Sequence, residues 1–209
     1  MRVIAIDGPA GSGKSTVART LAARLGLDYL DSGAMYRSVT FAALRRGIDP
    51  GDADKVGAVA RDIEMEIAGE VTVDGVDATR EIRGPEVSKA VSTVAANPDV
   101  RVEMVRRQRE WAAEHGGGVI EGRDIGTVVF PQAELKVYLT ASEGERARRR
   151  QQQVDDLTYD DAAANIALRD RVDSTRATSP LAVADDAVVI DTTGRTVDDV
   201  VDEIVGRLA

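Results

Sequence analysis

Residues 8–15 read Gly8-Pro9-Ala10-Gly11-Ser12-Gly13-Lys14-Ser15. They follow the apolar run Val3–Ile6 and lead directly into Thr16–Leu21, which has helical patterning. A strand, a glycine-rich loop and a helix in this order fit the phosphate-binding pattern G-x-x-x-x-G-K-[ST] at every fixed position. In such a loop the backbone N–H groups and the start of the helix face phosphate oxygens. A glycine-rich turn that matches by chance is the alternative, and the flanking strand and helix argue against it.

The loop therefore predicts a nucleoside triphosphate site. Lys14 is expected to reach the β- and γ-phosphates, and the Ser15 hydroxyl to bind Mg²⁺. The residues expected to contact ATP here are Gly8, Pro9, Ala10, Gly11, Ser12, Gly13, Lys14, Ser15 and Thr16.

Composition narrows the class of protein. The 209 residues suit one domain with a small insertion, and the absence of cysteine excludes disulfides and thiolate metal sites. The net charge of −9 argues against binding to a nucleic-acid polymer. The sequence has no signal peptide and no apolar run of membrane length, so we expect a cytoplasmic protein without a membrane partner. No long apolar helix face is left over, and we expect a monomer.

Short apolar, β-branched runs separated by helical segments predict an α/β fold with a five-stranded parallel sheet in three layers. The expected strands are Val3–Ile6, Asp28–Leu30, Val119–Ile120, Leu135–Leu139 and Val188–Ile190.

Capping residues mark the helix ends. Ser32 is expected to cap the second helix, and Ser142 with Glu145 forms a capping box before an arginine-rich helix. Asn97-Pro98 predicts the start of a helix that runs towards Trp111.

Alternating residues around Asp74-Gly75 interrupt the α/β rhythm. Val71, Val73 and Val76 flank this dipeptide, which is a strong hairpin signal. We therefore predict a small antiparallel insertion between about Ile63 and Ile82.

Polar motifs follow two of the strands. Asp31–Arg37 comes after the second strand and Glu121–Thr127 after the third. Ligands of open α/β sheets bind at the carboxyl ends of strands, so both motifs are expected near the phosphate loop. A helix cap with a solvated arginine, and a surface ion pair, are the plain alternatives.

A third charged run covers residues 169–176. If it is helical throughout, Arg169, Asp173 and Arg176 share one face. A solvated, self-paired helix surface is the alternative.

The residue types favour one kind of phosphate acceptor. Transfer to an alcohol usually needs a carboxylate base, whereas a monophosphate has a second pKa near ~6 and is already ionised. Arginines that offset the repulsion between two anions suit the second reaction. The arginine-rich motifs therefore favour a phosphate acceptor over an alcohol.

These motifs, in this order, resemble the bacterial cytidylate kinases, a branch of the nucleoside monophosphate kinases among P-loop proteins. The most specific stretches are IDGPAGSGKS, LDSGAMYR, EIRGPEVS, EGRDIGTVVFP and RDRVDSTR. The resemblance implies an ATP-dependent kinase that phosphorylates CMP and dCMP. It also implies a core of about 1–35, 97–145 and 180–209, a monophosphate-binding insertion of about 36–96 with the small sheet, and a helical lid of about 146–172.

The same resemblance implies roles for individual residues. The cytidylate is expected to contact Asp31, Ser32, Arg37, Ser92, Arg101, Gly122, Arg123, Asp124, Arg169, Asp173 and Arg176. Catalysis is assigned to Lys14, Arg123, Arg169 and Arg176, and ATP contacts in the lid to Arg146 and Arg149. Asp124 is expected to accept a hydrogen bond from the cytosine amino group.

Two other functions remain open at this point. One is a small P-loop kinase that acts on UMP, AMP or an alcohol such as shikimate. The other is a nucleotide-dependent switch without turnover, against which the arginine-rich lid argues.

Overall fold

The structure is a computed structural model that describes residues 1–153 and 157–208. It divides into two compact units, Met1–Tyr29 with Ala112–Ala209 and Leu30–Trp111. Part of the expected lid, residues 154–156, lies outside the described residues. Among the described residues, no helix combines the length and apolar character needed to cross a bilayer.

The larger sheet has five strands in the order β2-β6-β1-β7-β8. The strands are β1 (Arg2–Asp7), β2 (Tyr29–Asp31), β6 (Gly117–Glu121), β7 (Leu135–Thr140) and β8 (Val188–Asp191). β1 lies between β6 and β7 and pairs with both in parallel. The predicted five-stranded parallel sheet is confirmed, and each strand lies within a residue or two of its expected place.

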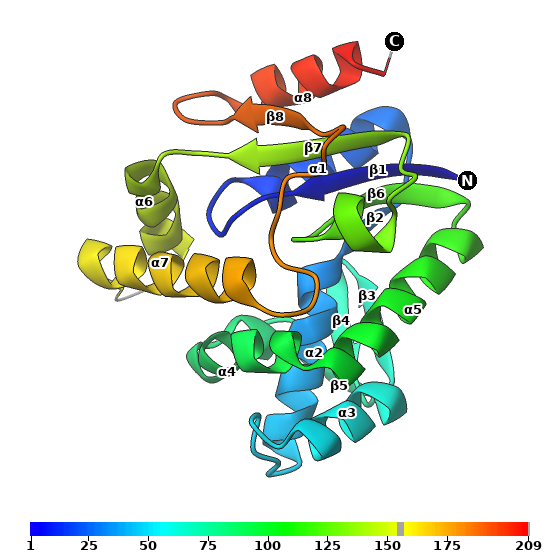
Figure 1. The fold of residues 1–209 in the computed structure, drawn as a ribbon, viewed down its shortest axis with the longest axis vertical. Coiled ribbons are helices and arrows are strands. Elements are labelled where there is room, and N and C mark those ends of the chain that lie inside the picture. The colour runs from blue at the N-terminus through cyan, green and yellow to red at the C-terminus, as the bar shows by residue number, and fades with distance from the viewer. Residues whose placement is uncertain (154–156, 209) are drawn as a thin grey trace. The chain divides into compact units, whose positions relative to one another are not determined.

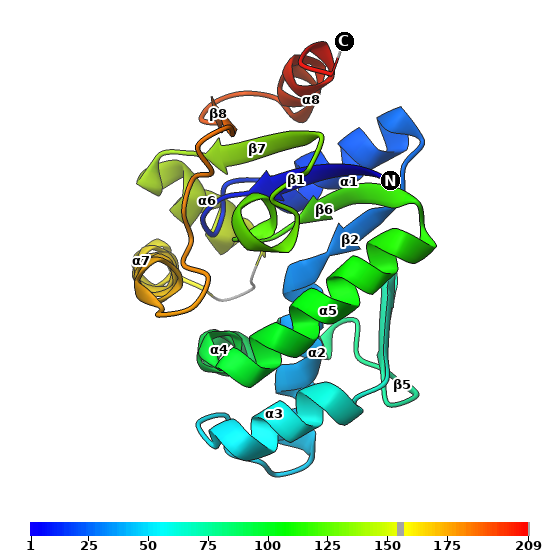
Figure 2. The same cartoon turned by 45° about the vertical axis from the view of Figure 1, so that its right-hand side comes forward.

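Helices of the first unit cover this sheet and lie at its carboxyl edge. They are α1 (Lys14–Leu25), α6 (Glu143–Gln153), α7 (Tyr159–Thr175), α8 (Val197–Gly206) and a short π-helix, η2 (Ile125–Val129). Figures 1 and 2 show β1 and β7 running towards the end of the sheet where α6 lies.

The core of the first unit forms where α1 and α8 pack on β1, β7 and β8. Leu21 of α1 and Ile204 of α8 are fully buried against Ile4 and Leu139. The apolar face of α8 is therefore part of the core. Truncating such a side chain to alanine typically costs about 2–5 kcal/mol.

The second unit is built around α2 (Ser32–Arg45), which contacts α3, α4 and the small sheet. Its other elements are α3 (Ala53–Asp62), β3 (Met65–Ala68), β4 (Glu70–Val73), β5 (Val76–Asp77), the 3₁₀-helix η1 (Glu81–Arg83), α4 (Pro85–Ala96) and most of α5 (Pro98–Glu114). The strands pair antiparallel in the order β3-β4-β5. Asp74 and Gly75 both have positive φ, 50° and 74°, so the predicted hairpin turn is confirmed.

Two capping predictions are wrong. Asp31, not Ser32, caps α2: its carboxylate accepts a hydrogen bond from Ala34 N at 2.9 Å, and Ser32 is the first helical residue. At α6, Ser142 accepts from Glu145 N at 3.3 Å, but Glu145 does not complete a capping box. Its carboxylate pairs instead with Arg148 and Arg149, because arginines lie one turn further along the same helix.

Candidate active site

The glycine-rich loop lies between the carboxyl end of β1 and the start of α1, as predicted. Gly8, Gly11 and Gly13 have positive φ, which curls the backbone. Lys14 opens α1, followed by Ser15 and Thr16 in the first turn. Its Nζ donates to Pro9 O at 2.7 Å and to Ser12 Oγ at 3.4 Å. The lysine thus folds back over its own loop.

Lys14 lies in an electropositive, dehydrated setting. Burial, followed by the positive charge of Arg123, lowers the pKa of Lys14 to about 7. Glu121 and Asp7 act in the opposite direction. An anion placed beside Lys14 would therefore be strongly favoured.

Two arginines of α6 lie against the phosphate loop and its neighbour Thr192. Arg146 Nη1 donates to Ala10 O at 3.2 Å, and its backbone is so close that a methyl group on Gly11 would lie 2.9 Å from Arg146 O. Arg149 donates to Thr192 Oγ1 and O, both at 2.9 Å. Thr192 Oγ1 in turn donates to Ser12 O at 3.0 Å. The expected lid arginines are therefore next to the phosphate loop.

A charged cluster forms where the segment after β6 meets the end of α7. Arg123 Nε donates to Asp173 Oδ2 at 2.9 Å. The guanidinium of Arg176 lies 3.7 Å from Asp173 Oδ1 and also 3.7 Å from Asp124 Oδ1. All four side chains are mostly buried. The structure thus brings together Arg123, Asp124, Asp173 and Arg176, from motifs about fifty residues apart in the sequence.

Arg176 is not on the helix face that the spacing predicts. α7 ends at Thr175, and Arg176 has extended backbone angles of −63° and 142°. Its Nε donates to Ser179 O at 2.5 Å. The helix stops because the chain turns back, with Leu181 N donating to Asp173 O at 2.7 Å.

Arg169 lies on α7 near the same cations. Burial, followed by the charge of Arg123, lowers the pKa of Arg169 to about 10. Its Nε is buried and has no hydrogen-bond partner among the described residues. The positive charge of Arg169 also lowers the pKa of Lys14. Arg169 therefore adds to the buried positive charge around Lys14.

Five other expected acceptor-site residues lie in the second unit. Asp31 also pairs with Arg83 Nη2 at 3.1 Å, beside its capping bond. Arg37 Nη1 donates to Ile82 O at 2.9 Å and to Ser88 Oγ at 3.1 Å. Residues 32 and 92 are on α2 and α4, the first buried and the second partly exposed.

Arg101, on α5, is 3 % exposed and lies with its guanidinium carbon 5.4 Å from the centroid of the Tyr36 ring. One of its nitrogens donates to Ala95 O at 3.2 Å. Stacking on an aromatic ring fixes the plane of a guanidinium, which suits recognition of a planar group.

Sequence reasoning assigned no role to two carboxylates at this site. Asp170 accepts from Ala10 N and pairs with Arg146. Asp7 accepts from the backbone of Ile125 and Gly126. The backbone N–H groups that these carboxylates bind are more than a hundred residues away along the chain, so no local pattern could have identified the contacts.

Comparison with known proteins shows the family of the chain. The family model for cytidylate kinase matches residues 4–209. The chain belongs to the cytidylate kinase family. A cytidylate kinase of Mycobacterium avium is 49 % identical over 97 % of this chain and 92 % of its own length. One of Limosilactobacillus reuteri is also 49 % identical, over 96 % of this chain and 92 % of its own length.

Similarity in fold extends to solved structures of more distant sequence. A gluconokinase of Sinorhizobium meliloti superposes with a TM-score of 0.55 at 14 % identity, covering 99 % of this chain and 91 % of the other. At this identity the likeness concerns the fold alone.

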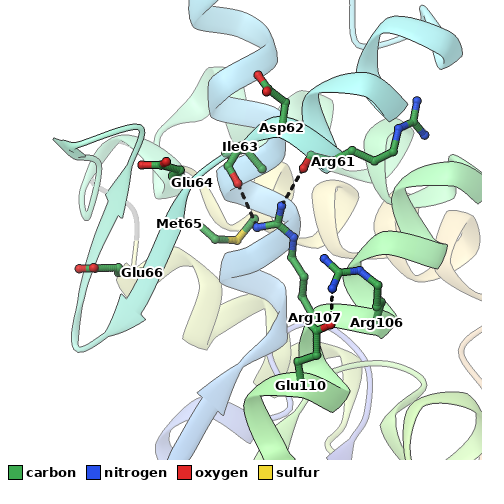
Figure 3. Close-up of a pocket in the computed structure, with 9 residues that line it drawn as sticks. All are labelled: Arg61, Asp62, Ile63, Glu64, Met65, Glu66, Arg106, Arg107 and Glu110. Atoms are coloured by element: carbon green, nitrogen blue, oxygen red, sulfur yellow. Dashed lines mark hydrogen bonds and ion pairs between the residues drawn. The ribbon is translucent and has the colours of Figure 1, made fainter. Parts of the chain in front are cut away.

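A shallow depression of about 580 Å³ lies in the second unit, between α3, β3 and α5 (Figure 3). Arg107 Nη1 donates there to Ile63 O at 2.9 Å, and Nη2 to Ala60 O and Arg61 O. These bonds satisfy carbonyls at the end of α3, and Arg106 pairs with Glu110. Arg106 and Arg107 in this depression thus make hydrogen bonds and ion pairs within the protein. The phosphate loop therefore remains the candidate active site of this member of the cytidylate kinase family.

Proposed function

We infer that this chain transfers the γ-phosphoryl group of ATP to CMP and dCMP, forming CDP or dCDP and ADP. The observation that carries the inference is the buried positive charge of Lys14, Arg123 and Arg169 beside a phosphate loop, in a chain that belongs to the cytidylate kinase family. The charges of Arg123 and Arg169 lower the pKa of Lys14, and the charge of Arg123 lowers the pKa of Arg169, so the site stabilises negative charge when nucleotides bind.

In the proposed reaction an oxygen of the acceptor phosphate attacks the γ-phosphorus in line. The new P–O bond forms as the bond from the γ-phosphorus to the β–γ bridging oxygen breaks, and ADP leaves. The acceptor oxygen is already ionised near neutral pH, so no side chain has to remove a proton. Lys14, Arg123, Arg169 and Arg176 are proposed to stabilise the charge that moves from the acceptor to ADP.

Mg²⁺ is proposed to bind with ATP at Ser15. The fit rests on the donor chemistry: Mg²⁺ prefers hard oxygens and usually takes few protein ligands besides phosphates and water. Ser15 supplies a hydroxyl in the first turn of α1, next to Lys14. When bound, Mg²⁺ neutralises phosphate charge.

We propose that the acceptor nucleotide contacts eleven residues. The set is Asp31, Ser32, Arg37, Ser92, Arg101, Gly122, Arg123, Asp124, Arg169, Asp173 and Arg176. Asp124 would accept from the cytosine 4-amino group, where uracil instead presents a carbonyl. Arg37 and Arg123 would bind the acceptor phosphate, and Arg169 with Asp173 the pentose. Discrimination against UMP then follows from the unpaired carboxylate that UMP would face.

The ATP side of the proposal comprises residues 8–16 with Arg146 and Arg149. The segment of about 146–172 acts as a lid that excludes water, and residues of about 36–96 form the monophosphate-binding insertion. We further propose that the enzyme is a cytoplasmic monomer. Size-exclusion chromatography with light scattering tests the monomeric state.

A coupled ADP-release assay tests the reaction. ATP and Mg²⁺ are supplied with CMP, dCMP, UMP, AMP or shikimate in parallel. Turnover with CMP and dCMP well above the others is expected. Preferred turnover of another acceptor would refute the cytosine specificity, and no turnover with any of them would refute the kinase assignment.

A further inference from the structure

Asp7 is a buried carboxylate to which the proposed reaction gives no role. It is the last residue of β1, directly before the phosphate loop, and only 5 % exposed. Its Oδ1 accepts from Ile125 N at 2.9 Å and its Oδ2 from Gly126 N at 2.7 Å. These N–H groups open the π-helix η2, which follows Arg123 and Asp124.

Asp7 caps η2 in place of Asp124. Asp124 occupies the position before η2, and an aspartate there normally turns its carboxylate back to accept from the first helical N–H groups. Asp124 makes no such capping bond, and its Oδ1 lies 3.7 Å from Arg176 instead. Because Asp7 caps η2 from another strand, the carboxylate of Asp124 is directed to the site rather than to its own backbone.

Keeping Asp7 ionised is unfavourable in itself. Burial raises the pKa of Asp7 to about 6, while its bonds to Gly126 and Ile125 lower it and the charge of Asp124 raises it. A buried carboxylate in this position is explained by the two N–H groups it binds, since it offers a separate oxygen to each, whereas an amide side chain has only one acceptor oxygen.

We propose that Asp7 is a positioning residue for base recognition, which holds the turn carrying Arg123 and Asp124 so that the site discriminates cytosine from uracil. This inference rests on the proposed role of Asp124. Asp7 lies beside Lys14 as well, so the alternative is that it acts on ATP through that lysine.

The test compares kcat/KM for CMP and for UMP in Asp7→Asn. Asparagine keeps the size but has one acceptor oxygen, and its NH₂ group opposes one of the two N–H groups. We expect the CMP-to-UMP ratio to fall at least tenfold while KM for ATP changes less than threefold. Asp52→Asn is the matched control, because Asp52 caps α3 by accepting from Lys55 N at 3.2 Å and belongs to neither nucleotide site; its ratio should not change.

Asp7→Ser provides a second variant should the asparagine variant fail to fold. It removes the buried charge, leaves both N–H groups without the carboxylate, and should reduce the ratio similarly. Hydrogen exchange at Ile125 and Gly126 should accelerate in either variant while exchange in β6 stays slow. An unchanged CMP-to-UMP ratio, or a change confined to KM for ATP, would overturn the proposal. Failure of the proposed function is distinct, since wild-type protein would then not turn over CMP.

Discussion

Asp170 Oδ1 accepts a hydrogen bond from Ala10 N at 3.1 Å, so a carboxylate of α7 lies on the phosphate loop. Asp170 also pairs with Arg146 of α6, and Arg146 donates to Ala10 O. Both backbone groups of one loop residue are thus bound by side chains of two different helices. The two charges are coupled, because each would lose its partner if the other were removed.

This pair predicts a non-additive double-mutant cycle. Arg146→Ala and Asp170→Ala should each destabilise the protein, and the double variant should lose little more than either single one. The coupling free energy of unfolding is expected to be about 1–3 kcal/mol, as for mostly buried groups in direct contact. Chemical denaturation of the four proteins measures it. Simple additivity would mean that the pair contributes nothing of its own.

From the lowered pKa of Lys14 we predict that the protein takes up a proton when ATP binds. The Lys14 pKa of about 7 lies well below the usual lysine value of 10.5, so at pH 8 most Lys14 is neutral in the free protein. Phosphates next to Nζ favour the charged form, and binding of ATP-Mg should take up most of one proton. Calorimetry at pH 8 in two buffers with different ionisation enthalpies measures this uptake.

Lys14→Met is the control for that measurement. It should show no such uptake and should lose at least a hundredfold in kcat, because the β- and γ-phosphates lose their cation. The variant should still unfold cooperatively, since methionine avoids the burial of a charge. Equal proton uptake in wild type and variant would assign it to another group.

The sequence predicted the parts of the fold that have local causes. Short apolar runs of two to five residues predicted the parallel strands, and Asp74-Gly75 predicted a hairpin whose turn needs positive φ. The phosphate loop followed from the spacing of its glycines, Lys14 and Ser15 between a strand and a helix. These features depend on residues that are neighbours in the chain.

The failures have non-local causes. Asp31 and Ser32 are both good caps, and the choice depends on β2 continuing to Asp31. The end of α7 is set by the returning chain at Leu181, so the helical spacing that included Arg176 was misleading. The bonds of Asp7 span more than a hundred residues. Such contacts are determined by strand order, which spacing does not encode.

The cap of α2 predicts a difference between adjacent variants. Asp31→Ala should lower the free energy of unfolding by about 1 kcal/mol or more, because Ala34 N loses its acceptor. It also removes the ion pair with Arg83, whose contribution is small because Arg83 is half exposed. Ser32→Ala, one residue further on, should cost less. Denaturant unfolding compares the two, and the reverse order would restore Ser32 as the cap.

We predict that substitutions of Asp124 change the preference between CMP and UMP. Asp124→Ala should raise KM for CMP far more than KM for ATP, because the cytosine amino group loses its acceptor. Asp124→Asn should go further and improve UMP relative to CMP, since an amide NH₂ group can donate to the uracil carbonyl. Steady-state kinetics with both acceptors at saturating ATP measure the two ratios. If CMP and ATP affinities fell together in Asp124→Ala, the carboxylate would serve the structure, through its proximity to Arg176, rather than base recognition.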